Sequence, residues 1–130
     1  MQQADITVKD IDGSTDLVYA AVVPAAGDSS PAVWRFLTAG KPTTHADTLE
    51  ISSKDNVPKT ARRVTANFVH PVVQIVDGRE VVTDRIPFTI SGPSIMGVDP
   101  TENERAVKRF FNLLADPAVQ AQFISGYAAR

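Results

Sequence analysis

The alternation of polar and apolar residues predicts antiparallel strands at the start of the chain. The segment Asp5–Ile11 alternates with the period of a half-buried strand, and Asp16–Val23 follows as its partner. Asp12-Gly13 lies between them and is a dipeptide that favours a two-residue type I′ turn. We therefore expect an N-terminal hairpin over about residues 4–23.

A longer series of strands is predicted over about residues 32–91. Ala32–Leu37 is a short strand, and the segments Ala46–Lys54 and Arg63–Val69 alternate again. Each of the two alternating segments therefore has one apolar face and one polar face. The apolar face is expected to carry Leu49, Ile51, Val64, Ala66, Phe68 and His70.

A second Asp-Gly pair, Asp77-Gly78, predicts another tight turn between two valine-rich segments. We expect these segments to project as a hairpin. Arg85–Ser91 is the last strand predicted, ending before Gly92-Pro93. Pro87 within it has no N–H group, which indicates a sheet edge or a bulge.

The C-terminal third predicts two helices, over about residues 99–115 and 117–125. Asp99 is a good N-cap, Pro100 suits the first helical position, and Glu102 has the spacing of a capping box. The same pair of an N-cap aspartate and a proline occurs at Asp116-Pro117, and Ser125-Gly126 is a plausible end of the second helix. Strands followed by helices indicate a single α+β domain over residues 1–130.

The first helix has an apolar arc of roughly 160°, wider than the ~100° stripe that seats a helix on one sheet. One interpretation is that the helix contacts a second surface besides its own sheet. The other is a single deep core, and the helical wheel does not choose between them. The arc comprises Ala106, Val107, Phe110, Phe111, Leu113 and Leu114, with Arg105, Lys108, Arg109 and Asn112 opposite.

Composition narrows the class of protein further. The chain has 130 residues, a net charge of −2 and no cysteine, so disulfides and thiolate chemistry are excluded. Its start has neither the basic nor the apolar region of a signal peptide, and no apolar run approaches the ~18 residues of a membrane span. We expect no membrane partner.

The sequence offers little for an enzyme, which would need a deep pocket with converging titratable groups. No nucleophile elbow, phosphate loop, dinucleotide fingerprint or HExxH metal motif occurs, and we expect no metal or cofactor. His45 is interpreted as solvated and His70 as packed. The acidic residues Asp10, Asp12 and Asp16 lack EF-hand spacing and are explained by turn chemistry.

The polar strand faces could form one flat surface. Hydroxyls, amides and cations together suit RNA phosphates and unpaired bases. A solvated outer face gives the same pattern, Glu50 opposes RNA binding, and alternation places no aromatic residue there. The candidate RNA-binding residues are Thr48, Ser52, Lys54, Arg63, Thr65, Asn67, Arg85 and Thr89, and Lys54, Lys59, Arg62 and Arg63 form a local basic cluster.

The ordered set of elements resembles the coat proteins of single-stranded RNA bacteriophages of the levivirus type, over nearly the whole chain. Thr101–Val107 and Leu113–Pro117 are similar to the acidic cap, Glu-Arg start and Leu-Leu-Ala hinge of one coat-protein branch. Val69–Val73 is similar to the valine-proline passage into the family's long loop. Phe88–Ile90 is similar to the strand before the helices, and Tyr127 lies near the family's terminal tyrosine.

The resemblance implies a homodimer in which two sheets join edge to edge and each subunit's helices pack on the partner's sheet. Such dimers would form a T=3 icosahedral virion that encloses viral RNA and assembles in the bacterial cytoplasm. The same sheet would bind a hairpin operator and repress replicase translation. The alternative is a small dimeric RNA-binding repressor that never forms a shell.

The resemblance also implies roles for particular residues. Arg63, Thr65 and Asn67 fall where the family places Lys, Thr and Lys for RNA. The strand that often carries a base-stacking tyrosine has Arg85 and Pro87 instead. The dimer interface would include Val107, Phe110, Phe111 and Leu114, and the loop between dimers would be Val76, Asp77, Gly78 and Arg79.

Overall fold

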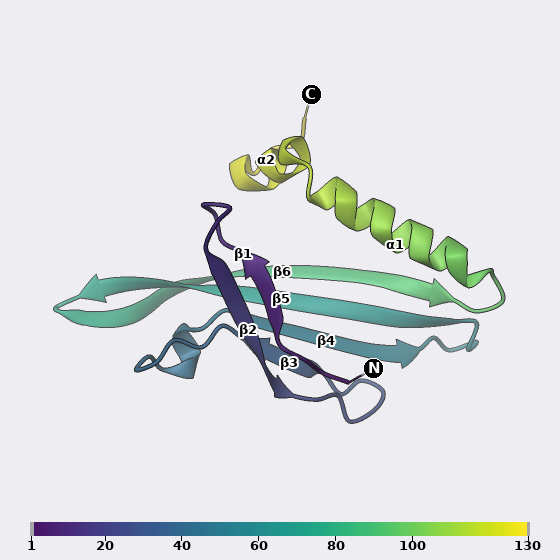
Figure 1. Ribbon diagram of the computed structural model, residues 1–130, viewed down its shortest axis with the longest axis horizontal. Helices are drawn as coiled ribbons and strands as arrows, with labels where there is room; N and C mark the ends of the chain where they lie inside the picture. The colour runs from purple at the N-terminus through teal and green to yellow at the C-terminus, as the bar shows by residue number, and fades with distance from the viewer. Residues whose placement is uncertain (1, 130) are drawn as a thin grey trace. The chain divides into compact units, whose positions relative to one another are not determined.

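The computed structural model describes residues 2–129 and divides the chain into two compact units, Met1–Ser94 and Ile95–Arg130. The first unit is a six-stranded sheet in which sequence neighbours are spatial neighbours, in the order β1-β2-β3-β4-β5-β6 (Figure 1). This arrangement followed by two helices confirms the predicted α+β class. The strands are β1 (Ile6–Lys9), β2 (Asp16–Val23), β3 (Ala32–Arg35), β4 (Thr48–Asp55), β5 (Ala61–Val76) and β6 (Arg79–Ile95).

The N-terminal hairpin is confirmed, with β1 and β2 antiparallel and Ile6 opposite Tyr19. The predicted two-residue type I′ turn is wrong, because Asp12 does not have a positive φ and only Gly13 does, at 74°. The Asp12 carboxylate instead accepts the backbone N–H groups of Ser14 and Thr15, at 2.9 and 2.8 Å. These bonds hold a longer loop. A hydrogen bond from the Thr15 hydroxyl is the largest cause that lowers the pKa of Asp12 to about 2, and the two backbone bonds add to it.

Strands β5 and β6 are longer than predicted and form one extended hairpin beside β4 (Figure 1). Asp77 and Gly78 form their connection with φ values of 52° and 75°, the positive pair that a type I′ turn requires. Strand β6 does not end at Ser91 but continues to Ile95. It is the outermost strand, which explains why it tolerates the missing N–H of Pro87.

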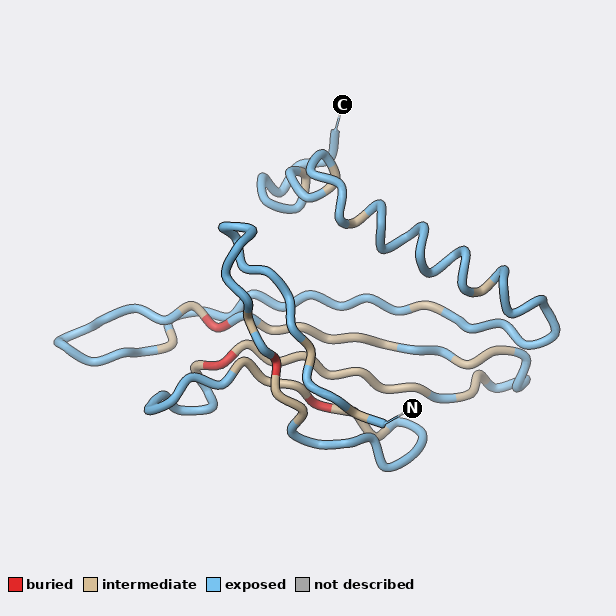
Figure 2. Tube along the Cα trace, in the orientation of Figure 1, coloured by how far each residue is buried: buried red, intermediate tan, exposed pale blue. Residues whose placement is uncertain are grey.

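Little of the first unit is buried, as Figure 2 shows. Of residues 2–129, only Tyr19, Val33, Ala46 and Pro71 are buried. The Tyr19 ring lies 5.8 Å from Phe36 and 6.5 Å from that of Phe68, centroid to centroid. One face of the sheet therefore has a small aromatic centre, and many apolar side chains of this unit are exposed.

The second unit comprises α1 (Pro100–Leu114) and α2 (Pro117–Ser125). Asp99 accepts the N–H of Thr101 at 2.9 Å, and Asp116 accepts that of Ala118 at 2.9 Å, so both predicted caps are confirmed. Gly126, at φ 81°, ends α2 in the left-handed conformation. The Glu102 side chain pairs with Arg105. No helix within residues 2–129 is long and apolar enough to cross a membrane.

Candidate nucleic-acid interface

The strand register brings the predicted polar residues of β4 and β5 onto one face of the sheet. Ser52 lies opposite Thr65, and Lys54 lies opposite Arg63. Because side chains directly opposite each other in an antiparallel pair share a face, the alternation predicted from the sequence is confirmed for these strands. Thr48, Ser52, Lys54, Arg63, Thr65 and Asn67 therefore form one surface, which we call the polar face, and Glu50 lies on it opposite Asn67.

Hydrogen bonds between side chains extend the polar face onto β6. The Thr89 hydroxyl donates to Asn67 Oδ1 at 2.8 Å, and Arg63 Nη1 donates to Ser91 Oγ at 3.0 Å. The hydroxyls of Thr65 and Ser91 are 3.4 Å apart. Ser91 was missing from the predicted set, although it lies two residues beyond Thr89 and simple alternation would have found it.

The charge on the polar face differs from the predicted basic cluster. Arg35 joins the face because it lies opposite Thr48, a register that the sequence does not reveal. Arg62 lies on the other face, where its guanidinium is 2.6 Å from Asp28 and 2.7 Å from Asp55. The Arg62 hydrogen bond lowers the pKa of Asp28, so that arginine is already neutralised locally.

Arg85, one of the predicted RNA-binding residues, lies on β6 four residues before Thr89. Its side chain forms no hydrogen bond or ion pair within residues 2–129. Its backbone N–H donates to Asp84 Oδ1 at 2.8 Å. The structure thus brings Thr89 into the hydrogen-bonded cluster and leaves Arg85 further along the strand.

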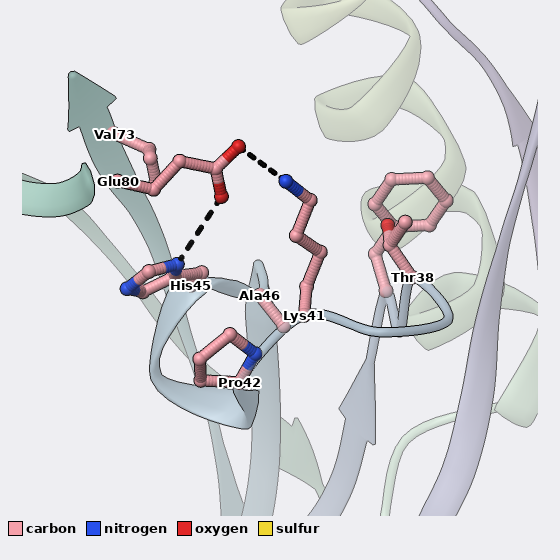
Figure 3. Close-up of a pocket in the computed structure, with 8 residues that line it drawn as sticks. Thr38, Lys41, Pro42, His45, Ala46, Val73 and Glu80 are labelled. Carbon is pink, nitrogen blue, oxygen red and sulfur yellow. Dashed lines mark hydrogen bonds and ion pairs between the residues drawn. The ribbon is translucent and has the colours of Figure 1, made fainter. Parts of the chain in front are cut away.

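A separate cluster connects the β5–β6 hairpin to the segment between β3 and β4. Lys41 Nζ contacts Glu80 Oε1, and His45 Nδ1 is 3.8 Å from Glu80 Oε2 (Figure 3). The hydrogen bond from Lys41 is the largest of the causes that lower the pKa of Glu80. Together with Phe36, Val73 and three other residues, this cluster lines a cavity of about 220 Å³.

Both histidines differ from expectation. His45 is not solvated: its side chain is 14% exposed and lines the cavity just described. His70 is not packed but half exposed, with Nδ1 2.6 Å from Asp47 Oδ1. Asp47 also accepts from the Tyr19 hydroxyl at 2.9 Å, and burial together with this bond raises the pKa of Tyr19. Each histidine thus connects the segment before β4 to the β5–β6 hairpin.

The proposed dimer surface on α1 is apolar and uncovered in the single chain. Phe110 and Phe111 are 47% and 52% exposed, and their ring centroids are 6.0 Å apart. Val107 is 49% exposed, and neither helix contains a buried residue within the described chain. The described residues also contain no group of three or more side chains that could hold a metal ion.

No protein-family description matches the chain, and no curated protein matches its sequence. Solved structures do match. The virus-like particle of Beihai levi-like virus 21 aligns with a TM-score of 0.83 and 18% identity, over 100% of this chain and 99% of that one. The virus-like particle of bacteriophage NT-214 gives 0.82 and 15%, over 100% of both chains. The bacteriophage GA protein capsid gives 0.73 and 17%, over 96% and 95%. The chain therefore has the levivirus-type coat-protein fold, as its sequence indicated.

Proposed function

We propose that this protein is the coat protein of a single-stranded RNA bacteriophage, and that it dimerises and assembles into a T=3 shell around viral RNA. The observation that carries the proposal is a coat-protein fold, matched end to end, whose two helices contain no buried residue among those described. Helices stabilised mainly by packing of an apolar face need a surface to cover that face. A second copy of the chain supplies one.

The dimer is proposed to form through the free edge of β6 and the apolar side of α1. An edge strand with unpaired backbone groups can pair with the same strand of another copy. Two-fold symmetry makes every contact occur twice, so Val107, Phe110, Phe111 and Leu114 of each copy are proposed to cover the partner's sheet. The exposed apolar residues of the first unit, such as Ile86 and Phe88 at 43% and 45%, offer the complementary surface.

The polar face is proposed to line the shell and bind RNA. It carries hydroxyls, an amide and the cations Lys54 and Arg63, which suit phosphate oxygens. The β5–β6 turn, Val76 to Arg79, is proposed to contact neighbouring dimers around the symmetry axes. Repression of replicase translation through a hairpin operator is part of the same proposal, as is assembly in the bacterial cytoplasm.

Size-exclusion chromatography with electron microscopy of the recombinant protein tests this function. We expect closed particles with the strong ultraviolet absorbance of packaged nucleic acid. A stable dimer that never forms particles would favour the alternative of a small RNA-binding repressor. A monomer at high concentration, without RNA, would overturn both.

A further inference from the structure

Aspartate followed directly by glycine occurs twice in the chain, and the two pairs differ in structure. Asp12-Gly13 and Asp77-Gly78 both lie in exposed turns that connect neighbouring strands. An aspartate in this setting can react with the next residue, because glycine has no side chain to shield its backbone nitrogen. The nitrogen attacks the side-chain carboxyl carbon when the carboxyl is neutral. The reaction therefore depends on what holds these two groups in the folded chain.

Both reacting groups are held at Asp12-Gly13. The Asp12 carboxylate accepts hydrogen bonds from the backbone N–H groups of Ser14 and Thr15 and from the Thr15 hydroxyl. The Gly13 N–H donates to the Asp10 carbonyl oxygen at 2.9 Å, which fixes the nitrogen that would attack. A pKa of about 2 instead of the ordinary 3.8 also makes the neutral carboxyl more than about tenfold rarer at neutral pH. This aspartate is therefore protected from the reaction.

Neither group is held at Asp77-Gly78. Within residues 2–129 the Asp77 carboxylate makes no hydrogen bond or ion pair, and the Gly78 N–H donates to no backbone oxygen. Asp77 has a φ of 52°, a left-handed conformation that is unfavourable for a residue with a β-carbon. The turn lies at the exposed end of the β5–β6 hairpin (Figure 2), and exposed turns open locally at low cost. Such opening lets the Gly78 nitrogen reach the Asp77 carboxyl carbon.

The reaction is an isomerisation through a cyclic imide. The Gly78 nitrogen forms a bond with Asp77 Cγ, and its proton leaves with the carboxyl hydroxyl as one water. Water then adds to either carbonyl of the ring. Opening at Cγ restores aspartate, whereas opening at the main-chain carbonyl of Asp77 leaves the chain joined through Cγ, as isoaspartate. One water is lost and one is gained, so the reaction needs no oxidant and no reactant besides solvent.

We propose that Asp77 is a site of spontaneous isomerisation to isoaspartate, and that dimers lose the ability to form shells as this product accumulates. Isoaspartate adds one carbon to the main chain of a two-residue turn, and the turn type and length set the register of both strands. The turn, Val76 to Arg79, is the segment proposed to contact neighbouring dimers. The loss of assembly rests on that proposed function, whereas the isomerisation itself does not.

The modification is tested by ageing the purified protein in neutral buffer for several weeks. Trypsin separates the two pairs, which fall on the peptides Asp10–Arg35 and Val64–Arg79. Isoaspartyl methyltransferase labels the α-carboxyl that isoaspartate exposes, and fragmentation in a mass spectrometer locates the labelled residue. Asp77 is expected to carry at least about tenfold more isoaspartate than Asp12. Labelling of Asp12 that equals that of Asp77, or no labelling at Asp77, would overturn the inference.

Three variants control for the mechanism. Asp77→Asn should speed the modification, because asparagine tolerates the turn conformation and its amide leaves as ammonia. Asp77→Gly removes the carboxyl, suits the positive φ, and should show no isoaspartate at this position. Thr15→Val removes the hydroxyl bond to Asp12 and should raise the labelling of Asp12 alone. Unchanged labelling in Asp77→Asn or in Thr15→Val would contradict the mechanism.

The effect on assembly is measured within one aged sample of the unaltered protein. Aged dimers are mixed with RNA, and shells are separated from unassembled dimers by sedimentation. Isoaspartate at Asp77 should be enriched in the unassembled fraction, and an equal content in both fractions would overturn the effect on assembly. Fresh dimers that never form shells would contradict the proposed function and with it this effect, while the labelling of Asp77 still decides the modification.

Discussion

Replacing Phe111 with alanine tests whether the apolar side of α1 is buried in an assembly. Phe111 is 52% exposed in the single chain. An aromatic side chain buries about 150–250 Å² in full, so about 100 Å² remains for a partner to cover. At about 25 cal/mol per Å² this area contributes about 2.5 kcal/mol per copy, or about 5 kcal/mol for the two copies of a dimer. A difference of that size raises the dimer dissociation constant by more than about a thousandfold.

The assay is sedimentation of Phe111→Ala over a range of concentrations, with chemical unfolding monitored beside it. Asn112→Ala is the control, because Asn112 lies on the polar side of the same helix and is exposed. Changes at such surface positions stay within about 0.5 kcal/mol. If Phe111→Ala dissociates and unfolds no more readily than Asn112→Ala, no second surface covers this helix and the dimer argument fails.

Three further predictions follow from local geometry. Gly78→Pro should leave dimers intact but block shells, since proline fixes φ near −65° while Gly78 has +75°; normal particles by microscopy would contradict this. Glu80→Gln should speed hydrogen exchange in the β5–β6 turn, whereas Asp16→Asn, in the exposed Lys9–Asp16 pair, should not. Because the pKa of Glu80 is lowered in the folded chain, its contribution to stability is present above the ordinary pKa of 4.5 and is lost as the pH falls through the lowered pKa. If protection of the turn amides does not change on acidification, that result would count against the contact. Asp99→Ala should cost about 1 kcal/mol of unfolding free energy, and an unchanged denaturation midpoint would argue against the cap.

Features encoded by neighbouring residues were predictable from the sequence. The alternation in β4 and β5 gave the correct faces, and the caps Asp99 and Asp116 marked both helix starts, because these signals act over a few residues. The Asp77-Gly78 turn was also correct. At Asp12-Gly13 the turn predicted from the same dipeptide was wrong, because the Asp12 carboxylate accepts hydrogen bonds from two backbone N–H groups and stabilises a longer loop.

Features that depend on register or on distant residues were not predictable. Arg62 and Arg63 are adjacent in the sequence but face opposite sides, and only Arg62 finds the carboxylates of Asp28 and Asp55. His45 is sheltered because Glu80, far away in the chain, approaches it. Ser91 on β6 joins the polar face by accepting a hydrogen bond from Arg63 on the neighbouring strand β5. Alternation therefore predicted the polar face of β4 and β5, but it predicted neither the position of Arg35 nor the hydrogen bonds of that face.

An electron cryomicroscopy reconstruction of recombinant particles tests both the proposed shell and the position of RNA within it. We expect closed shells built from dimers, with two β6 strands paired at each dimer axis and density for RNA against Arg63, Asn67 and Ser91. Shells in which the polar face points outward, or in which RNA density lies against another surface, would contradict this expectation, as would dimers that never close into a shell.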